Sequence, residues 1–250
     1  MENKIFLSIV TPAYNEAKNL KRGVLGKIVD YLKTQKFSWE VIFVDDGSSD
    51  DTVKIIEKFM KDNRGIKLMK EPHRGKGGAI IAGILKARGK YVLFSDMDQS
   101  TPLNQLEKFL PKVEKGYDIV IGSRSGRPGQ TIERKIMAAG WVVLRSLILR
   151  LPYKDTQCGF KLFKKEAAET IFKKMRVYSE RVRASGASVT AGFDLEVLYI
   201  ARKLGYKVAE VPVEWFEFNE RREVSPIKDS WEGFRDLVRV RMNALKGEYK

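Results

Sequence analysis

The stretch Tyr91-Val92-Leu93-Phe94-Ser95-Asp96-Met97-Asp98 places a short apolar run directly before two carboxylates. Such a run, ended by polar residues, is typical of a strand buried on both faces of a parallel sheet. The pattern recurs along the chain, and the expected strands cover residues 5–10, 41–44, 66–69, 118–121, 159–163 and 207–213. Helical patterns separate them, at residues 16–32, 51–61, 79–87, 103–114 and 193–203. This alternation predicts an α/β fold with a mostly parallel, Rossmann-like sheet and helices on both faces.

The bulk composition limits the classes of site that the chain can build. Its 250 residues are 43% hydrophobic, which is enough for one full core. The single cysteine, Cys158, excludes an internal disulfide, so we expect a packed thiol and a reducing, cytoplasmic setting. The single histidine, His73, excludes a site with several imidazole ligands, and we expect it to be a surface or packing residue. Any metal would therefore bind oxygen ligands, which favours Mg²⁺ or Mn²⁺ over zinc.

The charge of the chain predicts an anionic partner. The formal net charge is +15 at pH 7, which leaves nucleic acid, an anionic membrane surface and phosphorylated ligands open. We find no signal-peptide pattern and no run of roughly 20 apolar residues that would span a bilayer. Membrane contact would then be peripheral, on the inner face.

Two segments combine apolar residues with arginines, as helices lying in a bilayer interface do. They are residues 131–152, which contain Arg134 and Arg145, and the basic tail, residues 221–250. In that interpretation their arginines lie on lipid phosphates. Simple packing of both segments against the sheet is the alternative.

Polar clusters follow four of the expected strands, at residues 11–16, 45–50, 96–98 and 122–124. Ligands of open α/β sheets bind outside the carboxyl ends of the strands, so these clusters are expected to converge on one crevice. Asp96 and Asp98 can be brought onto one cation, which in turn binds a diphosphate, although a solvated acidic turn has the same sequence. Asp46 can hold a base or ribose and Tyr14 can stack on a base, but a turn and a helix cap would use the same residues.

Three further segments are candidates for contacts with substrates. The glycine-rich residues 74–79 can approach a phosphate at a helix N-terminus, although the spacing is not that of a P-loop. Residues 155–160 have polar side chains that can line the mouth of a crevice. Asp194 opens a helix, where it either complements the helix dipole or faces an acceptor.

Together these motifs resemble the family 2 glycosyltransferases of the GT-A fold. The chain has their order of motifs: Pro-Ala-Tyr-Asn-Glu at 12–16, Asp-Asp-Gly-Ser at 45–48, Gly-Lys-Gly-Gly-Ala at 75–79, Asp-x-Asp at 96–98 and Gly-Ser-Arg at 122–124. Residues 155–163, with the sequence DTQCGFKLF, are similar to the dolichyl-phosphate glucosyltransferase branch. The resemblance covers residues 5–215. It implies a GT-A domain at 1–220, which holds a membrane-facing helical segment at 131–152 and a mobile insertion at 177–191, followed by the tail.

The resemblance also implies the residues of the donor side. The pocket for the base and ribose corresponds to Pro12, Tyr14, Glu16 and Asp46. Lys76 and Asp96 would contact the nucleotide-sugar donor. The metal, Mg²⁺ or Mn²⁺, would be bound by Asp98, with Asp96 and Gln99. Gln99 is a departure, since relatives commonly have glycine there, and it either ligates the metal or alters the fit of the donor.

On the acceptor side the resemblance implies a polyprenyl or dolichyl phosphate. Residues near its phosphate or in the adjoining loop correspond to Arg124, Arg134, Asp155 and Gln157. The catalytic set would be Asp98, Arg124 and Asp194, and Asp194 matches the acidic position often assigned as the base in inverting members. A phosphate acceptor is largely ionised at neutral pH, however, and needs little help from a base.

The predicted reaction is an inverting transfer of glucose from UDP-glucose to dolichyl or polyprenyl phosphate, which supplies a lipid-linked sugar for protein glycosylation. GDP-mannose and UDP-N-acetylglucosamine are alternative donors. A sugar-1-phosphate nucleotidyltransferase would need a glycine-rich loop with Arg and Lys after the first strand. This chain has Thr-Pro-Ala-Tyr-Asn there, at residues 11–15, which disfavours that class of enzyme. A nucleic-acid-binding protein is a further alternative, but only the net charge supports it. We therefore expect no nucleic acid as a partner. The sequence leaves the oligomeric state open.

Overall fold

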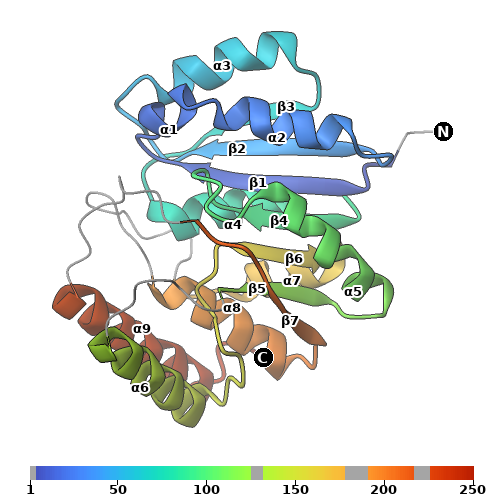
Figure 1. Cartoon of the computed structure of the whole chain (residues 1–250). Helices are drawn as coiled ribbons and strands as arrows, with labels where there is room; N and C mark the ends of the chain where they lie inside the picture. The colour runs from blue at the N-terminus through green and yellow to red at the C-terminus, as the bar shows by residue number, and fades with distance from the viewer. Residues whose placement is uncertain (1–3, 125–131, 178–190, 217–225) are drawn as a thin grey trace.

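The computed structural model describes residues 4–124, 132–177, 191–216 and 226–250, and these form a seven-stranded sheet (Figure 1). The strands are β1 (Leu7–Ala13), β2 (Trp39–Asp45), β3 (Ile66–Lys70), β4 (Tyr91–Ser95), β5 (Ile119–Ser123), β6 (Phe160–Lys164) and β7 (Val208–Pro212). Their order is β3-β2-β1-β4-β6-β5-β7. Every pairing is parallel except those of β6, which runs antiparallel to both β4 and β5. The mostly parallel sheet predicted from the apolar runs is confirmed.

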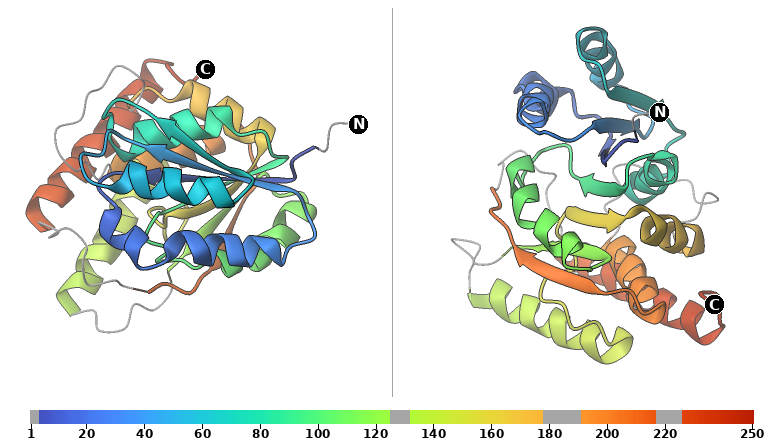
Figure 2. Two further views of the ribbon diagram at one scale, coloured as in Figure 1. Left: turned by 90° about the horizontal axis from the view of Figure 1, so that it is seen from above. Right: turned by 90° about the vertical axis from the view of Figure 1, so that its right-hand side faces the viewer.

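Helices cover both faces of this sheet (Figure 2). One face carries α1 (Ala17–Lys21), α2 (Val24–Lys33), α3 (Thr52–Asp62), the 3₁₀ helix η1 (Leu103–Lys108) and α5 (Leu110–Glu114). The other carries α4 (Gly75–Lys86), α7 (Lys165–Lys174) and α8 (Ala191–Lys203), with α9 (Pro226–Leu245) packed beside α8 and α6 (Ile132–Leu149) beside α9. Adjacent strand residues divide between the two cores: Ile9 packs in the first and Val10 in the second. Because strand side chains alternate between faces, a strand covered by helices on both sides is apolar on both, which explains the continuous apolar runs of β2 and β4.

Two of the expected helices are interrupted. The helix expected at residues 16–32 is divided into α1 and α2 at Gly23, whose φ of +80° belongs to the left-handed region that glycine tolerates. The helix expected at 103–114 begins as η1 and restarts as α5 after Phe109. Pro111 lies in the first turn of α5, where its missing N–H costs nothing, whereas inside one long helix it would remove a hydrogen bond.

Helix α4 begins four residues earlier than expected, and α7 was not expected from the sequence at all. Glycines disfavour helix in isolation, but here they let α4 pack closely against the sheet. A Cβ atom on Gly83 would lie 2.5 Å from Val10 Cγ1 and 2.7 Å from Val44 Cγ2. The structure places residues 75–78 in the first turn of α4, so Lys76 lies at the N-terminus of this helix.

Helices α6 and α9 lie side by side below the sheet (Figures 1 and 2). Helix α9 buries Leu237 and Val240 in the same core as α8. The expected contact of Arg145 with lipid phosphates is wrong, because this side chain is 2% exposed and donates to Thr156 Oγ1 at 2.7 Å and to the backbone carbonyls of Tyr153 and Lys154. It therefore fixes the loop before β6 and does not reach lipid phosphates. Among the described residues, no helix has the length and apolarity needed to cross a bilayer.

A buried carboxylate joins three parts of the chain. Glu196 of α8 accepts hydrogen bonds from the backbone N–H groups of Arg176 at 2.7 Å and Val177 at 3.0 Å, and from the Tyr249 hydroxyl at 2.8 Å. Both Glu196 and Tyr249 are fully buried. The penultimate residue of the chain is thereby docked into the core and linked to the end of α7.

We expect Glu196→Ala to lower the free energy of unfolding by about 2–4 kcal/mol, because it leaves the buried Tyr249 hydroxyl without its acceptor, at about 1–3 kcal/mol, and also removes the acceptor of two part-buried backbone N–H groups. Urea denaturation measures the loss. Glu169→Ala is the control, since Glu169 makes only surface ion pairs at 3.7 and 3.9 Å and should change stability by about 0.5 kcal/mol or less. Equal stabilities of the two variants would contradict the anchoring role of Glu196.

Candidate active site

The predicted site residues meet at one edge of the sheet, where the parallel strands end. Asp46 follows β2, Asp96 and Asp98 follow β4, and Arg124 follows β5. Because β6 is antiparallel, its beginning lies at this same edge, and Asp96 N–H donates to the carbonyl of Gly159 at 3.1 Å. The convergence expected from the carboxyl ends of the strands is present.

Asp96 is held by a lysine on the facing helix. The Asp96 Oδ1 atom lies 2.6 Å from Nζ of Lys76, and this ammonium lies 5.4 Å from the centre of the Phe94 ring. Burial lowers the pKa of Lys76, but the carboxylates of Asp96, Asp194 and Asp98 outweigh burial and raise the pKa above its usual value. Lys76 is thus a fixed positive charge at the N-terminus of α4.

Gly159 is packed against the same aspartate. A Cβ atom at this position would lie 1.9 Å from Asp96 Oδ2 and 2.3 Å from Asp96 Cγ. No side chain larger than hydrogen can occupy this position while Asp96 stays in place. The glycine is part of the site, although the sequence analysis gave it no role.

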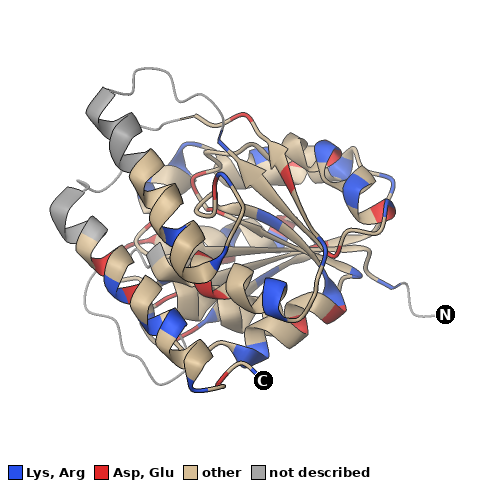
Figure 3. Cartoon of the chain, turned by 90° about the horizontal axis from the view of Figure 1, so that it is seen from below, with Lys and Arg blue, Asp and Glu red and all other residues tan. Residues whose placement is uncertain are grey.

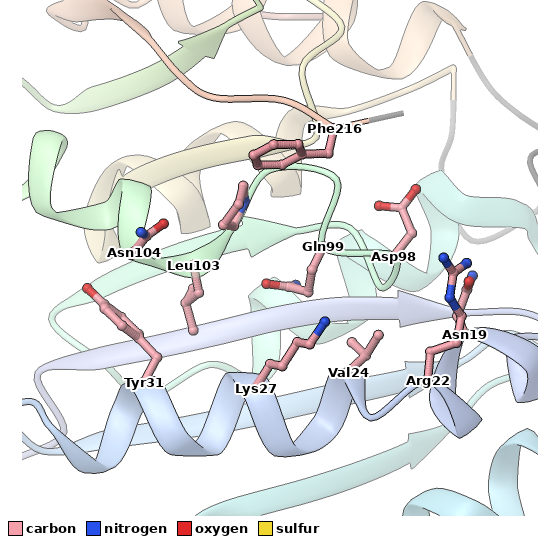
Figure 4. A pocket seen from close by; sticks show the side chains of 11 residues that line it. Asn19, Arg22, Val24, Lys27, Tyr31, Asp98, Gln99, Leu103, Asn104 and Phe216 are labelled. Atoms are coloured by element: carbon pink, nitrogen blue, oxygen red, sulfur yellow. The ribbon is translucent and has the colours of Figure 1, made fainter. Parts of the chain in front are cut away.

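Asp98 and Gln99 line a pocket of about 440 Å³ between α2 and the turn after β4 (Figure 4). Asp98 Oδ1 accepts the backbone N–H of Ser100 at 2.9 Å. The Gln99 amide nitrogen donates to Ser95 Oγ at 3.0 Å and to the Asp96 carbonyl at 2.9 Å. Gln99 adopts φ of +49°, so this turn is held by its own side chains. Basic and polar groups from α1, α2 and the turn between them line the pocket from the other side: Asn19, Arg22, Lys27 and Tyr31.

Tyr14, His73 and Asp46 form one cluster. The rings of Tyr14 and His73 are stacked, with centroids 4.3 Å apart and planes 12° apart. His73 Nδ1 lies 2.8 Å from Asp46 Oδ2 and 3.0 Å from the Asp46 carbonyl, and since a carbonyl only accepts, Nδ1 carries a proton. Arg74 N–H donates to Asp46 Oδ1 at 2.8 Å. The expected packing role of His73 is present, and it also orients Asp46, which the sequence analysis did not anticipate.

Glu16 and Pro12 lie close to this cluster in the fold. Pro12 is buried in β1 beside Val44 of β2, so it shapes the end of the strand. Burial raises the pKa of Glu16, a hydrogen bond from Asn19 at 2.5 Å acts against it, and the charges of Asp98 and Asp96 raise it further. Glu16 therefore shares the electrostatic environment of the acidic pair.

Arg124 and Asp155 form a bidentate ion pair. Arg124 Nε lies 2.6 Å from Asp155 Oδ2, Nη2 lies 2.9 Å from Oδ1, and the backbone N–H of Arg124 also donates to Oδ2. Although burial would raise the pKa of Asp155, the guanidinium holds it well below its usual range. The Arg124 guanidinium lies 5.9 Å from the Trp215 ring. Asp155 thus fixes the direction of Arg124, and Gln157, which is exposed, donates its backbone N–H to Asp155 at 3.0 Å.

Asp194 lies in the first turn of α8, where it pairs with a lysine that the sequence analysis missed. Lys161 of β6 places Nζ 2.6 Å from Asp194 Oδ1. Burial raises the pKa of Asp194 above the usual aspartate value, although Lys161 and Lys76 act in the opposite direction. The lysines of two ion pairs, Lys76–Asp96 and Lys161–Asp194, lie 5.4 and 5.8 Å from the centre of the Phe94 ring, so the two pairs are on the same side of the sheet.

Two predicted elements lie outside the described residues. The side chain of Arg134 is one, and the insertion at 177–191 is the other, apart from its first and last residues. The buried Cys158 bears out the packed thiol, and burial raises its pKa, which makes it a poor nucleophile.

The acidic pair fits a hard divalent cation that is completed by a substrate. Among residues 4–124, 132–177, 191–216 and 226–250, no three His, Cys, Asp or Glu side chains form a metal site. Mg²⁺ is commonly held by one or two carboxylates together with substrate phosphates, however, so a full protein cage is unnecessary. Asp98 lies on the pocket wall and Asp96 is two residues away in the chain, so two carboxylates are available to such a cation. The assignment of Gln99 as a ligand stays a prediction.

Comparison with known proteins agrees with this geometry. The model for glycosyl transferase family 2 matches residues 8–172. A dolichyl-phosphate beta-glucosyltransferase of Dictyostelium discoideum is 37% identical over an alignment of 273 positions, gaps included, which covers 100% of this chain and 80% of that protein. The proteins of the same description from Homo sapiens and Saccharomyces cerevisiae are 35% and 32% identical, with 98% and 100% of this chain covered and 77% and 78% of theirs.

Solved structures share the fold at lower identity. Mannosyl-3-phosphoglycerate synthase from Rubrobacter xylanophilus has a TM-score of 0.64 at 19% identity over 98% of this chain and 75% of its own. The mannosyltransferase PcManGT from Pyrobaculum calidifontis, in complex with GDP-Man and Mn²⁺, has a TM-score of 0.61 at 20% identity over 96% of this chain and 64% of its own. The family match over residues 8–172 and the relatives above 30% identity place the chain in glycosyl transferase family 2, and it is a glycosyltransferase.

Proposed function

We propose that the chain is an inverting glucosyltransferase that moves glucose from UDP-glucose onto dolichyl or polyprenyl phosphate. The observation that carries the proposal is the similarity, over essentially the whole chain, to proteins named dolichyl-phosphate beta-glucosyltransferase. A β-linked product from an α-linked nucleotide sugar requires inversion, which a single in-line displacement gives. The fold does not select the sugar, since the neighbour in complex with GDP-Man shares it.

In this mechanism the donor lies along the edge formed by β1, β2 and β4. Tyr14 provides a ring face for the base, and Asp46, held by His73 and Arg74, provides an oriented acceptor for base or ribose N–H and O–H groups. Lys76 provides a positive charge for the diphosphate. Because these groups are fixed before the donor arrives, little freedom is lost on binding.

Asp98, with Asp96, would hold Mg²⁺ or Mn²⁺. A bound divalent cation offsets the negative charge that develops on the leaving diphosphate. The Asp96 side chain is held by Lys76, and its backbone N–H by the Gly159 carbonyl.

Arg124 would bind the phosphate of the acceptor. The main obstacle to the reaction is the approach of an anionic phosphate to an anionic donor, and preorganised cationic donors reduce that repulsion. Arginine has five N–H donors, so its pair with Asp155 does not exhaust them. Asp194 would face the acceptor as a carboxylate held by Lys161, and deprotonation by a base is not needed for an acceptor that is already ionised.

The acceptor would be reached from a membrane surface. Large apolar side chains stay exposed on the paired helices α6 and α9: Val143, Leu147, Trp231, Phe234, Val238, Met242 and Leu245. In residues 139–149, the part of α6 whose side chains the structure describes, the inward-facing Arg145 is the only charged residue. Helix α9 carries charges of both signs (Figure 3). An apolar surface of this kind is typical of a binding site, and a lipid acceptor makes a bilayer interface its natural partner.

We expect the variant Val143→Ser/Leu147→Ser/Trp231→Ser to weaken binding to anionic vesicles containing dolichyl phosphate at least tenfold. The three side chains are 58%, 75% and 66% exposed, so the fold should tolerate the changes. Burying each in the interface contributes on the order of 1 kcal/mol or more, and about 1.4 kcal/mol is a tenfold change in affinity. Vesicle flotation measures the binding.

Leu204→Ser is the matched control, because Leu204 is an exposed apolar residue in the turn between α8 and β7. It should bind vesicles like the wild type. Unchanged binding of the triple variant would remove α6 and α9 as the membrane face and leave the transfer reaction in place.

The proposed function is tested with a panel of radiolabelled UDP- and GDP-sugars, dolichyl phosphate, and Mg²⁺, Mn²⁺ or EDTA. Labelled lipid from UDP-glucose, lost with EDTA, is the expected result. Transfer from GDP-mannose or UDP-N-acetylglucosamine instead would keep the mechanism and overturn the donor. Undiminished transfer in EDTA would contradict the metal assignment.

A further inference from the structure

Lys161 occupies a position in β6 where a charged side chain is unexpected. In the sheet it is paired with Phe94 of β4 on one side and with Ile121 of β5 on the other. Directly paired strand residues point to the same face, and Phe94 and Ile121 both belong to the core beneath α4 and α8. The lysine is 1% exposed. An ammonium group so deeply buried is strongly destabilising unless it is paired and hydrogen-bonded.

The ammonium has three compensating contacts, and all of them direct it toward the reaction edge of the sheet. Nζ lies 2.6 Å from Asp194 Oδ1 and 2.5 Å from the carbonyl oxygen of Cys158. It also lies 5.8 Å from the centre of the Phe94 ring, within the range of a cation–π contact. One side chain therefore joins the first turn of α8 to the turn that precedes β6.

Asp194 is in turn part of a compact arrangement of charges. Lys76 approaches the same Phe94 ring at 5.4 Å and pairs with Asp96. Asp194 and Asp96 interact electrostatically with Lys76, and Asp96 repels Asp194. A displacement of Asp194 would therefore alter both the acceptor side and the charge that is meant for the donor diphosphate.

We propose that Lys161 is a positioning residue for the transfer reaction, which acts by holding the Asp194 carboxylate in place beside the Lys76–Asp96 pair. The inference rests on the proposed function for the placement of Asp194 on the acceptor side. A buried ion pair by itself adds little to stability, since an apolar pair of similar volume often does as well. The charges of Lys161 and Asp194 are then explained by their role in the transfer reaction and not by a contribution to stability.

A double-mutant cycle on the full chain tests the proposal, with Lys161→Met, Asp194→Asn and the combined variant. Turnover number and KM for donor and acceptor are measured separately. We expect Lys161→Met to lower the turnover number about a hundredfold with a small change in donor KM, because a displacement of about 1 Å in a charged group beside the substrates is enough for such a loss. The combined variant should be no slower than Asp194→Asn alone, because the lysine acts through the aspartate.

Two further variants separate positioning from folding. Lys161→Arg keeps the charge and should recover most of the turnover lost in Lys161→Met. Lys164→Met is the matched control: Lys164 lies in the same strand and pairs with Asp118 at 2.9 Å, but it is 33% exposed and lies away from the site. It should turn over like the wild type. The combined variant, in which both charges are absent, should melt near the wild-type temperature.

Three outcomes would overturn the proposal. Losses of Lys161→Met and Asp194→Asn that multiply in the combined variant would show that the lysine acts independently of Asp194. Wild-type turnover in Asp194→Asn would remove the group through which Lys161 is meant to act. A Lys161→Met variant that loses thermal stability but keeps its turnover number would assign the pair to folding alone.

Failure of the proposed function is distinguished by the wild type itself. If it transfers no sugar to dolichyl phosphate, the acceptor assignment fails. The cycle is then measured on the release of nucleoside diphosphate from the nucleotide sugar that the wild type cleaves fastest. The same coupling in that reaction would support the role of Lys161, and its absence would contradict it.

Discussion

Replacement of Asp98 by alanine is expected to lower the turnover number about a thousandfold or more. Asp98 lies on the wall of the pocket beside Asp96, at the position where a cation would meet the donor diphosphate. Loss of the cation removes several kcal/mol of charge stabilisation from the leaving group, and about 4 kcal/mol corresponds to a thousandfold. The turn should persist without the hydrogen bond from Ser100 to Asp98, because Gln99 also holds it through Ser95 Oγ and the Asp96 carbonyl.

The matched control is Asp62→Ala, which removes an exposed carboxylate at the end of α3. It should transfer sugar like the wild type. EDTA should abolish the activity of the wild type, and Mg²⁺ or Mn²⁺ should restore it. Full activity of Asp98→Ala would contradict the metal role of this aspartate, whatever the effect of EDTA.

Gly159→Ala is expected to lower the turnover number about a hundredfold. The new Cβ would lie 1.9 Å from Asp96 Oδ2, far inside any contact distance, so either the carboxylate or the turn before β6 must move. The two residues are also joined by the hydrogen bond between Asp96 N–H and the Gly159 carbonyl. A movement of about 1 Å at a group that contacts substrate is enough for a loss of this size. Steady-state kinetics measures it.

Gly26→Ala is the control for this substitution. Gly26 lies within α2 and a Cβ there would meet nothing within 4 Å. Alanine is favoured over glycine in a helix by about 0.5–1 kcal/mol, so this variant should be fully active and at least as stable as the wild type. Wild-type kinetics in Gly159→Ala would show that the position of Asp96 is not critical.

The sheet was predictable from the sequence because its strands are buried on both faces. Runs such as Val41–Val44 and Tyr91–Phe94 carry no polar residue, and the polar clusters that follow them mark the edge at which ligands bind. The helices were less predictable. The glycines of α4 lower its intrinsic helix propensity, and propensity gives no sign of the close packing of Gly83 against Val10 and Val44.

Within the site, sequence reasoning identified residues that follow strands but missed those that act from inside an element. Lys161 is one residue of an otherwise apolar strand, and only the antiparallel register of β6 shows that it points to Asp194 and not to solvent. His73 was expected to be a surface or packing residue, yet it also orients Asp46, which lies 27 residues earlier in the chain. A lysine interrupting a buried run, as in Phe160-Lys161-Leu162-Phe163, is the signal that could have found the first of these.

Arg145 shows the opposite error. An arginine in an apolar helix suggested contact with lipid phosphates, but the side chain turns inward and binds the loop at Tyr153 and Thr156. The composition of a helix does not say which of its faces is covered. The outward face of α6 is apolar because its one charged residue between positions 139 and 149 is used for packing.

The most direct test of the account is transfer from UDP-[¹⁴C]glucose, with Mn²⁺ or Mg²⁺, to dolichyl phosphate compared with unphosphorylated dolichol and with a soluble sugar. Labelled lipid is expected from dolichyl phosphate alone, as a β-linked glucosyl phosphate. Transfer to dolichol or to the soluble sugar, with none to dolichyl phosphate, would contradict it, because Arg124 would then have no phosphate to bind.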